Sequence, residues 1–199
     1  GLHAINNVVD ITNFCLMETG QPLHAFDCDR LAEKRIVVRR AGEGELFTTL
    51  DSQQRILTSA DLVVCDAERP VALAGVMGGQ NSEIEDSTVS ILLESACFKP
   101  AAVRKTSKRL GLHTESSHRF ERGIDIGGVV RALDRAAGLI VELADGVSAL
   151  GVLDIYSDPS EPAAIIFRPE RANNLIGIEL PREEIVDILR SLECQVYEG

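Results

Sequence analysis

The amino-acid sequence predicts an α+β protein, in which a mixed, largely buried β-sheet with packed helices is followed by a small, truncated α/β piece. Apolar runs at residues 62–65, 71–76 and 89–93 have the length of strands. They are apolar on both faces, which is typical of central strands covered on both sides. The pattern turns helical after Phe98, most clearly over residues 127–144, where apolar positions recur every three or four residues.

The first part of the chain predicts one helix and three further strands. Residues 4–19 carry apolar and polar positions on opposite sides of a helix, and Gly20 is well placed to end it. A strand is expected at residues 35–40. Two short strands, near 46–50 and 54–57, are expected to flank a hairpin turn at 51–53.

The second part predicts helices over residues 100–110, with Gly111 as C-cap, and over 127–144. A last strand near 149–155 is expected to close the first unit. After it we expect a strand at 164–167, a helix at 168–175 and a helix that opens at Pro181. Because Ser, Asp and Pro dominate residues 157–162, this segment is interpreted as a linker between a first domain, 1–156, and the beginning of a second, 163–199.

Length and composition are those of a soluble globular protein. The chain has 199 residues, of which 45% are hydrophobic and 26% charged. No apolar run approaches the roughly 20 residues that a membrane helix needs, so we expect a cytoplasmic protein without a membrane partner. The first residue is Gly, and residues 195–197 resemble an interrupted strand, so we expect a piece of a longer protein.

Charge and cysteine content narrow the possible functions. The net charge of −11 argues against a protein that coats nucleic acid through its overall field. Residues 99–122 nevertheless carry seven lysines and arginines against two glutamates, and the alternative to a binding role for them is a solvated helix face. The five cysteines form no Cys-x-x-Cys pair, and no metal site is expected.

Motifs for covalent or nucleotide chemistry are missing from the sequence. It contains no Gly-x-Ser-x-Gly nucleophile elbow, no His-Glu-x-x-His and no Gly-x-x-x-x-Gly-Lys phosphate loop. Any enzymatic activity is therefore expected to depend on positioning and electrostatics rather than on a covalent nucleophile.

Five segments, taken together and in order, resemble the β subunit of bacterial phenylalanyl-tRNA synthetases. They are NNVVDITN at 6–13, GQPLHAFD at 20–27, ALAGVMGG at 72–79, LLESA at 92–96 and GLHTESSHRFERGID at 111–125. The resemblance covers residues 3–155 and implies the family's editing domain. From about residue 163 the chain resembles the start of the winged-helix-like domain that follows.

The resemblance implies a hydrolytic proofreading activity, which removes tyrosine wrongly attached to phenylalanine tRNA. It also implies phenylalanine tRNA as a partner and an α subunit in an α2β2 tetramer, where ligation takes place. The resemblance further implies that the whole enzyme uses ATP and magnesium. The family's magnesium-binding carboxylates in this subunit lie beyond residue 199, so no cofactor and no metal ligand is expected in this piece.

By position, the resemblance assigns most of the candidate site residues. Expected catalytic positions are His24, Gly78 and Thr114, and expected substrate-binding positions are Thr12, Asn13, Glu94 and Ser116. Ser116 is expected to matter for its small size rather than for its hydroxyl. Glu94 resembles the reader of the tyrosine hydroxyl.

Physical chemistry supports these roles, with alternatives. A carboxylate at Glu94 would accept the phenol proton of tyrosine and be left unpaired by phenylalanine; otherwise it is an exposed strand-end carboxylate. The N–H groups of Gly78 and Gly79 could stabilise an oxyanion, or the glycines could simply form a tight turn. His24 could orient or deprotonate water, or be a structural histidine.

Contact with tRNA phosphates is expected from the basic helix, through Arg104, Lys105, Lys108 and Arg109. Two other functions stay open. The first is a non-catalytic tRNA-binding or assembly module of the same subunit. The second is an unrelated small-molecule binding domain with a glycine-rich turn.

Overall fold

A computed structural model of the chain describes residues 4–157, 159 and 163–197. The described structure divides into two compact units, Gly1–Leu150 and Gly151–Gly199. Most of the predicted linker, namely residues 158 and 160–162, lies outside the described residues. The domain limits expected at 156 and 163 stay predictions.

The strands of the first unit form three small sheets. β1 (Leu23–Asp27) pairs with β8 (Ile91–Ser95), and β3 (Leu46–Thr48) pairs with β4 (Gln54–Ile56). A four-stranded sheet has the order β2-β5-β6-β7, with bounds Val37–Arg40, Leu62–Cys65, Pro70–Leu73 and Met77–Gly78. The α+β class is confirmed, but every pairing in the described residues is antiparallel. Parallel pairing needs a crossover of a dozen or more residues, which the short connections β3–β4, β5–β6 and β6–β7 do not provide.

The described residues of this unit also form four helices: α1 (Asn7–Thr19), α2 (Pro100–Leu110), α3 (Glu115–Phe120) and α4 (Val129–Leu143). Short 3₁₀ turns lie at Cys28–Arg30, Ala32–Lys34, Gln80–Ser82 and Ile126–Gly128. α1 begins where the Asn6 side chain accepts a hydrogen bond from the Val9 N–H, and it ends at Gly20, whose φ is 77°. α2 has the predicted bounds, because Pro100 opens it and Gly111 ends it with a φ of 67°.

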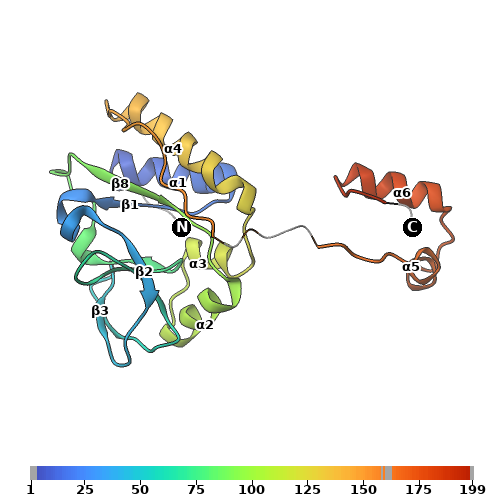
Figure 1. The fold of residues 1–199 in the computed structure, drawn as a ribbon, viewed down its shortest axis with the longest axis horizontal. Helices are drawn as coiled ribbons and strands as arrows, with labels where there is room; N and C mark the ends of the chain where they lie inside the picture. Colours follow the sequence, from blue (N-terminus) through green and yellow to red (C-terminus); the bar gives the residue numbers. More distant parts are fainter. Residues whose placement is uncertain (1–3, 158, 160–162, 198–199) are drawn as a thin grey trace. The chain divides into compact units, whose positions relative to one another are not determined.

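The β1–β8 ribbon separates two apolar clusters. On one side α1 and α4 lie along it (Figure 1), and Ile11, Cys15 and Ala136 pack there with Leu23 and Leu93. On the other side Phe26 and Leu92 join the main core, which also takes in α2 and α3. Because side chains alternate along a strand, His24 and Glu94 share the face of Phe26 and Leu92.

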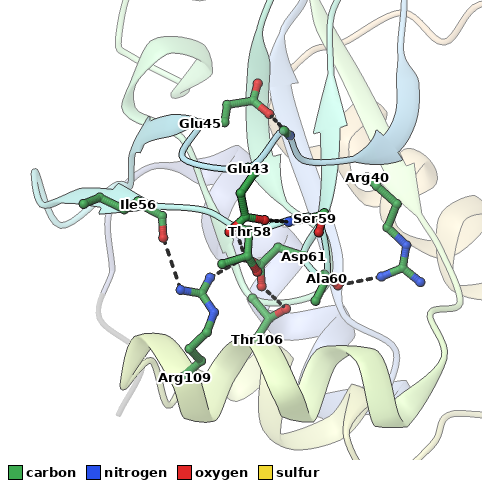
Figure 2. A network of polar contacts seen from close by, with 11 residues as sticks. Arg40, Glu43, Glu45, Ile56, Thr58, Ser59, Ala60, Asp61, Thr106 and Arg109 are labelled. Atoms are coloured by element: carbon green, nitrogen blue, oxygen red, sulfur yellow. Dashed lines mark hydrogen bonds and ion pairs between the residues drawn. The ribbon is translucent and has the colours of Figure 1, made fainter.

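A buried carboxylate ties α2 to the sheets (Figure 2). Asp61 is 1% exposed, and its oxygens accept hydrogen bonds from the Thr58 N–H at 2.8 Å and from the Thr106 hydroxyl at 2.8 Å. Arg109 forms an ion pair with the same carboxylate. Burial favours the neutral acid, but these hydrogen bonds and the Arg109 charge outweigh burial and lower the pKa of Asp61.

The second unit contains α5 (Pro169–Ile176) and α6 (Arg182–Ser191), which confirms the two helices expected after the linker. The strands predicted at 149–155 and 164–167 are wrong, since both segments are irregular. A strand needs a partner, and none of the described strands pairs with these segments. No helix among the described residues is long and apolar enough to cross a membrane.

Replacing Asp61 by Ala should lower the free energy of unfolding by about 3 kcal/mol, because it leaves buried donors and the Arg109 charge without an acceptor. Urea unfolding followed by circular dichroism measures the change. Asp86→Ala, at an exposed position, is the matched control and should change stability little. Equal stability of the two variants would contradict the structural importance of Asp61.

Candidate active site

A cavity of about 650 Å³ lies where the β1–β8 ribbon, the β6–β7 turn and α3 meet. Six of the expected site residues line it: Asn13, His24, Gly78, Glu94, Thr114 and Ser116. They come from five separate elements or turns of the chain. The fold therefore brings together residues that are up to about a hundred positions apart in the sequence.

His24 and Glu94 occupy directly opposite positions on β1 and β8. Side chains at such positions lie next to each other on one face of the ribbon. The His24 ring contacts Phe26 edge-on, with ring centroids 4.4 Å apart. Within residues 4–157, 159 and 163–197, neither His24 nor Glu94 has a side-chain hydrogen bond or ion pair, so both are available to a ligand.

Desolvation sets the protonation of this pair. Burial lowers the pKa of His24 to about 4, so its imidazole is neutral at pH 7. Burial raises the pKa of Glu94 to about 7, so its carboxyl group gains and loses a proton near neutral pH. The cavity thus holds a neutral imidazole beside a carboxyl group that readily changes its charge.

Gly78 forms the part of the wall closest to His24. A Cβ atom at this position would lie 2.6 Å from His24 Cε1 and 3.0 Å from Leu50 Cδ1. The Gly78 carbonyl accepts a hydrogen bond from the Leu50 N–H at 3.1 Å. A side chain at this position would therefore displace the imidazole of His24.

Gly79 does not line the cavity, and its expected contribution to an oxyanion site is not supported. Its N–H donates to the Val71 carbonyl at 2.7 Å, so this donor is already used inside the sheet. A Cβ atom on Gly79 would lie 2.7 Å from Phe47 Cζ and from the Val71 oxygen. Gly79 therefore allows close packing against Phe47 and the Val71 backbone.

The hydroxyl groups of the cavity wall are bonded to the backbone. Thr114 caps α3: its Oγ1 accepts from the Ser117 N–H at 3.0 Å and donates to the Val76 carbonyl at 2.7 Å. Ser116 donates to the Gly75 carbonyl at 3.2 Å, and Ser117 donates to the Thr114 carbonyl at 3.1 Å. The bonds of Thr114 to Val76 and of Ser116 to Gly75 fasten α3 to the β6–β7 turn.

Only one of the two α1 residues reaches the cavity. Asn13 lines it, and its amide has no hydrogen-bond partner in the part of the chain that the structure describes. Thr12 is 7% exposed, does not line the cavity, and donates its hydroxyl to the Val9 carbonyl at 2.8 Å. The expected substrate contact of Thr12 is therefore not supported.

The four cations assigned to tRNA lie on α2, away from the cavity lining. Arg109 is held by Asp61 and by the Ile56 carbonyl, to which it donates at 3.1 Å. Arg104, Lys105 and Lys108 are exposed. A phosphate contact by these three stays a prediction, whereas Arg109 has a structural task.

Sequence reasoning missed several lining residues, among them Leu50, His113, His118 and Arg119. His118 and Arg119 belong to α3, a helix that was not predicted. Thr114 and Ser117 form a capping box at its start, with Ser in place of the usual Glu or Gln, and this was the available signal. Among the described residues, no cluster of three or more His, Cys, Asp or Glu side chains could hold a metal ion.

Comparison with known proteins identifies the family. The sequence profile of the B3/4 domain matches residues 1–145. The chain belongs to the B3/4 domain family. The B3/4 domain thus includes every residue of the cavity lining.

Several relatives of this B3/4 domain are phenylalanine–tRNA ligase β subunits. The chain is 60% identical to the phenylalanine–tRNA ligase β subunit of Geobacter sulfurreducens over 193 residues, which is 97% of this chain and 24% of that subunit. The corresponding subunits of Syntrophotalea carbinolica and Moorella thermoacetica are 54% and 53% identical, each over 98% of this chain and 24% of the relative. The chain spans about a quarter of these relatives, and the resemblance to this subunit is confirmed.

Glu94 should make stability depend on pH. Its raised pKa means that the folded state holds the proton more tightly, so the contribution of Glu94 to stability is present below about pH 4.5 and is lost as pH rises through 7. Glu94→Gln should match the unsubstituted chain in stability at pH 4.5 and be more stable at pH 8.5, by about 1 kcal/mol after allowance for solvent in the cavity.

Urea unfolding at both pH values tests this prediction, with the exposed Glu83→Gln as control. A stability difference that does not change with pH would contradict the burial of Glu94.

Proposed function

We propose that this B3/4 domain hydrolyses the ester bond of tyrosine wrongly attached to phenylalanine tRNA, as the editing part of a phenylalanine–tRNA ligase β subunit. The observation that carries the proposal is the His24–Glu94 pair, which has no hydrogen-bond partner among the described residues and lines a cavity with Gly78 in its wall. An aromatic amino acid ester fits a cavity of about 650 Å³. The names of the relatives supply the ligase and the tRNA.

Glu94 selects tyrosine in this proposal. A synthetic pocket that holds phenylalanine discriminates poorly against an analogue that adds one hydroxyl group, so a second pocket must use that hydroxyl. A carboxylate at Glu94 accepts a hydrogen bond from the phenol hydroxyl of tyrosine. A hydrogen bond to a charged group contributes about 1.5–3 kcal/mol. Phenylalanine leaves the carboxylate desolvated and unpaired, which costs a comparable amount.

Hydrolysis in this proposal uses water directly. The three lining hydroxyls, on Thr114, Ser116 and Ser117, donate to backbone carbonyls and are not poised as nucleophiles. Water attacks the ester carbonyl, the bond to the ribose oxygen breaks, and that oxygen leaves with a proton. The pKa of about 4 makes His24 a weak base, so its neutral imidazole is better suited to orienting the water by accepting its hydrogen bond.

Asn13 supplies a second polar group for the same reaction. Its side-chain amide can donate a hydrogen bond to the ester carbonyl, on which negative charge develops during attack. It thus takes the place of the Gly79 N–H, which is bonded to Val71. We assign substrate binding to Asn13 and Glu94, and water positioning to His24.

The remainder of the β subunit and its partner complete the proposed enzyme. Ligation, with its ATP and magnesium, takes place outside this chain, in a cytoplasmic α2β2 tetramer. The editing step uses residues of one B3/4 domain, because the whole cavity lining lies within it. A non-catalytic tRNA-binding module would bind the same tRNA without releasing tyrosine.

In the complete ligase, Glu94→Ala and His24→Ala should each slow the release of tyrosine from Tyr-tRNA(Phe), by about 10–100-fold. Phenylalanylation should be unchanged, because it uses a different site. Deacylation of purified Tyr-tRNA(Phe) and steady-state aminoacylation measure the two activities. Unchanged tyrosine release in both variants would remove the site assignment, and no release by the unsubstituted ligase would favour the binding module.

Gly78→Ala should impair tyrosine release because the new methyl group displaces His24, and Gly78→Trp should abolish it by filling the cavity. The matched control is Gly138→Ala on α4, where a Cβ atom meets nothing within 4 Å. The same deacylation assay, with circular dichroism to check folding, compares the three variants. Full activity of Gly78→Trp would place the editing pocket elsewhere.

A further inference from the structure

A second pocket, of about 750 Å³, adjoins the candidate active site. It is formed by the end of α1 at Thr19 and Gly20, by the end of α3, and by the beginning of α4 at Gly128 and Arg131. His118 and Arg119 line both pockets. The two pockets therefore both border α3.

Three guanidinium groups, those of Arg119, Arg122 and Arg131, line this second pocket, against the one carboxylate of Asp125 in its lining. Each arginine also has an acidic neighbour: Arg119 pairs with Glu115 at 2.6 Å, Arg122 with Glu121 at 2.7 Å, and Arg131 with Asp125 at 3.1 Å. Ion pairs that are open to solvent are weak, and a phosphate can replace or share them.

Donors remain free on the two more exposed arginines. The Arg122 and Arg131 side chains are 58% and 79% exposed. Arg122 uses only Nη1, for the His118 carbonyl and Glu121, and Arg131 uses only Nη2, for Asp125. The other guanidinium N–H groups of these two residues have no acceptor among the described residues, and a guanidinium fork matches phosphate oxygens in geometry.

Gln21 adds an unpartnered buried acceptor to the same lining. The residue is 3% exposed, and its Nε2 donates to the carbonyls of Pro22 at 3.0 Å and Ala96 at 2.9 Å. These two bonds fix the orientation of the amide and leave Oε1 without a hydrogen bond in the described part of the chain. Because this oxygen is itself buried, Gln21 contributes to the wall of the pocket and not a contact with a ligand.

We propose that this second pocket binds the phosphate–ribose backbone of the tRNA 3′ end, next to the terminal nucleotide whose ester lies in the first cavity. The inference rests on the proposed function. Phosphates require the guanidinium donors, and the two pockets lie next to each other because they share His118 and Arg119 in their linings. The α2 cations line neither pocket and so do not hold this part of the RNA.

The test is the double variant Arg122→Ala/Arg131→Ala in the complete ligase, with two substrates. One is Tyr-tRNA(Phe), and the other is 3′-O-tyrosyl-adenosine, which has the ester and the terminal ribose but no phosphate. We expect kcat/KM for Tyr-tRNA(Phe) to fall about 10–100-fold, mainly through KM, and hydrolysis of the nucleoside ester to stay unchanged. The salt dependence of log(kcat/KM) should also become less steep, by about 0.7 for each lost phosphate contact.

Arg35→Ala is the matched control, because Arg35 is exposed, pairs with Glu33 at 3.4 Å and lines neither pocket. It should leave both substrates unaffected. An unchanged kcat/KM for Tyr-tRNA(Phe) in the double variant overturns the inference. Equal losses on both substrates also overturn it, since they indicate a structural disturbance of the first cavity.

Failure of the proposed function has a different signature, which is that the unsubstituted ligase hydrolyses neither substrate. In that case the inference is tested by binding alone. The affinity of the ligase is measured for a short RNA that ends in CCA and carries amide-linked tyrosine. The double variant should bind this RNA about 10-fold more weakly, while its affinity for amide-linked tyrosyl-adenosine stays the same. Equal affinity of the variant and the unsubstituted ligase for the RNA would refute the phosphate contact.

Discussion

The buried carboxylate of Asp61 is the constraint on which the rest of the first unit depends. A carboxylate with so little exposure is stable only if its oxygens accept hydrogen bonds or form ion pairs. Here Thr58 and Thr106 donate hydrogen bonds and Arg109 forms an ion pair. These bonds fix the position of α2, and Val103 on α2 contributes to the main core. The chain passes from α2 through Gly111 to α3, where Thr114 bonds to the Val76 carbonyl. Successive hydrogen bonds and an ion pair thus position the wall of the cavity.

Inside the cavity, desolvation of His24 and Glu94 is not offset by hydrogen bonds or ion pairs within the described residues. His24 and Glu94 have no compensating partner, so burial moves the pKa of each toward its neutral form. The ribbon places them side by side because their positions on β1 and β8 are opposite in register. Asp61 therefore has hydrogen-bond partners, whereas His24 and Glu94 have none among the described residues, and that contrast separates a supporting residue from a candidate functional one.

Local signals allowed much of the fold to be predicted. Pro100 and Gly111 define α2, and the turn at 51–53 defines the β3–β4 hairpin, because these effects involve only neighbouring residues. β1 was missed because its pairing with β8, more than sixty residues away, leaves no local trace. The strands expected at 149–155 and 164–167 had suitable composition but lack partners in the described structure. For the site, family resemblance pointed to the lining residues His24, Glu94 and Asn13, but the inward or outward direction of Thr12 and the bond made by the Gly79 N–H depend on tertiary contacts.

In the proposed enzyme, a substitution at Gly78 would impair editing without preventing folding or aminoacylation, because Gly78 closely approaches His24. The backbone at Gly78 needs no left-handed conformation, so a larger residue would disturb the imidazole without forbidding the strand. A cell with such a substitution would still make a folded β subunit and still charge its tRNA with phenylalanine. Its proteins would accumulate tyrosine at positions encoded as phenylalanine. The substitution would lower fitness only when tyrosine became abundant relative to phenylalanine.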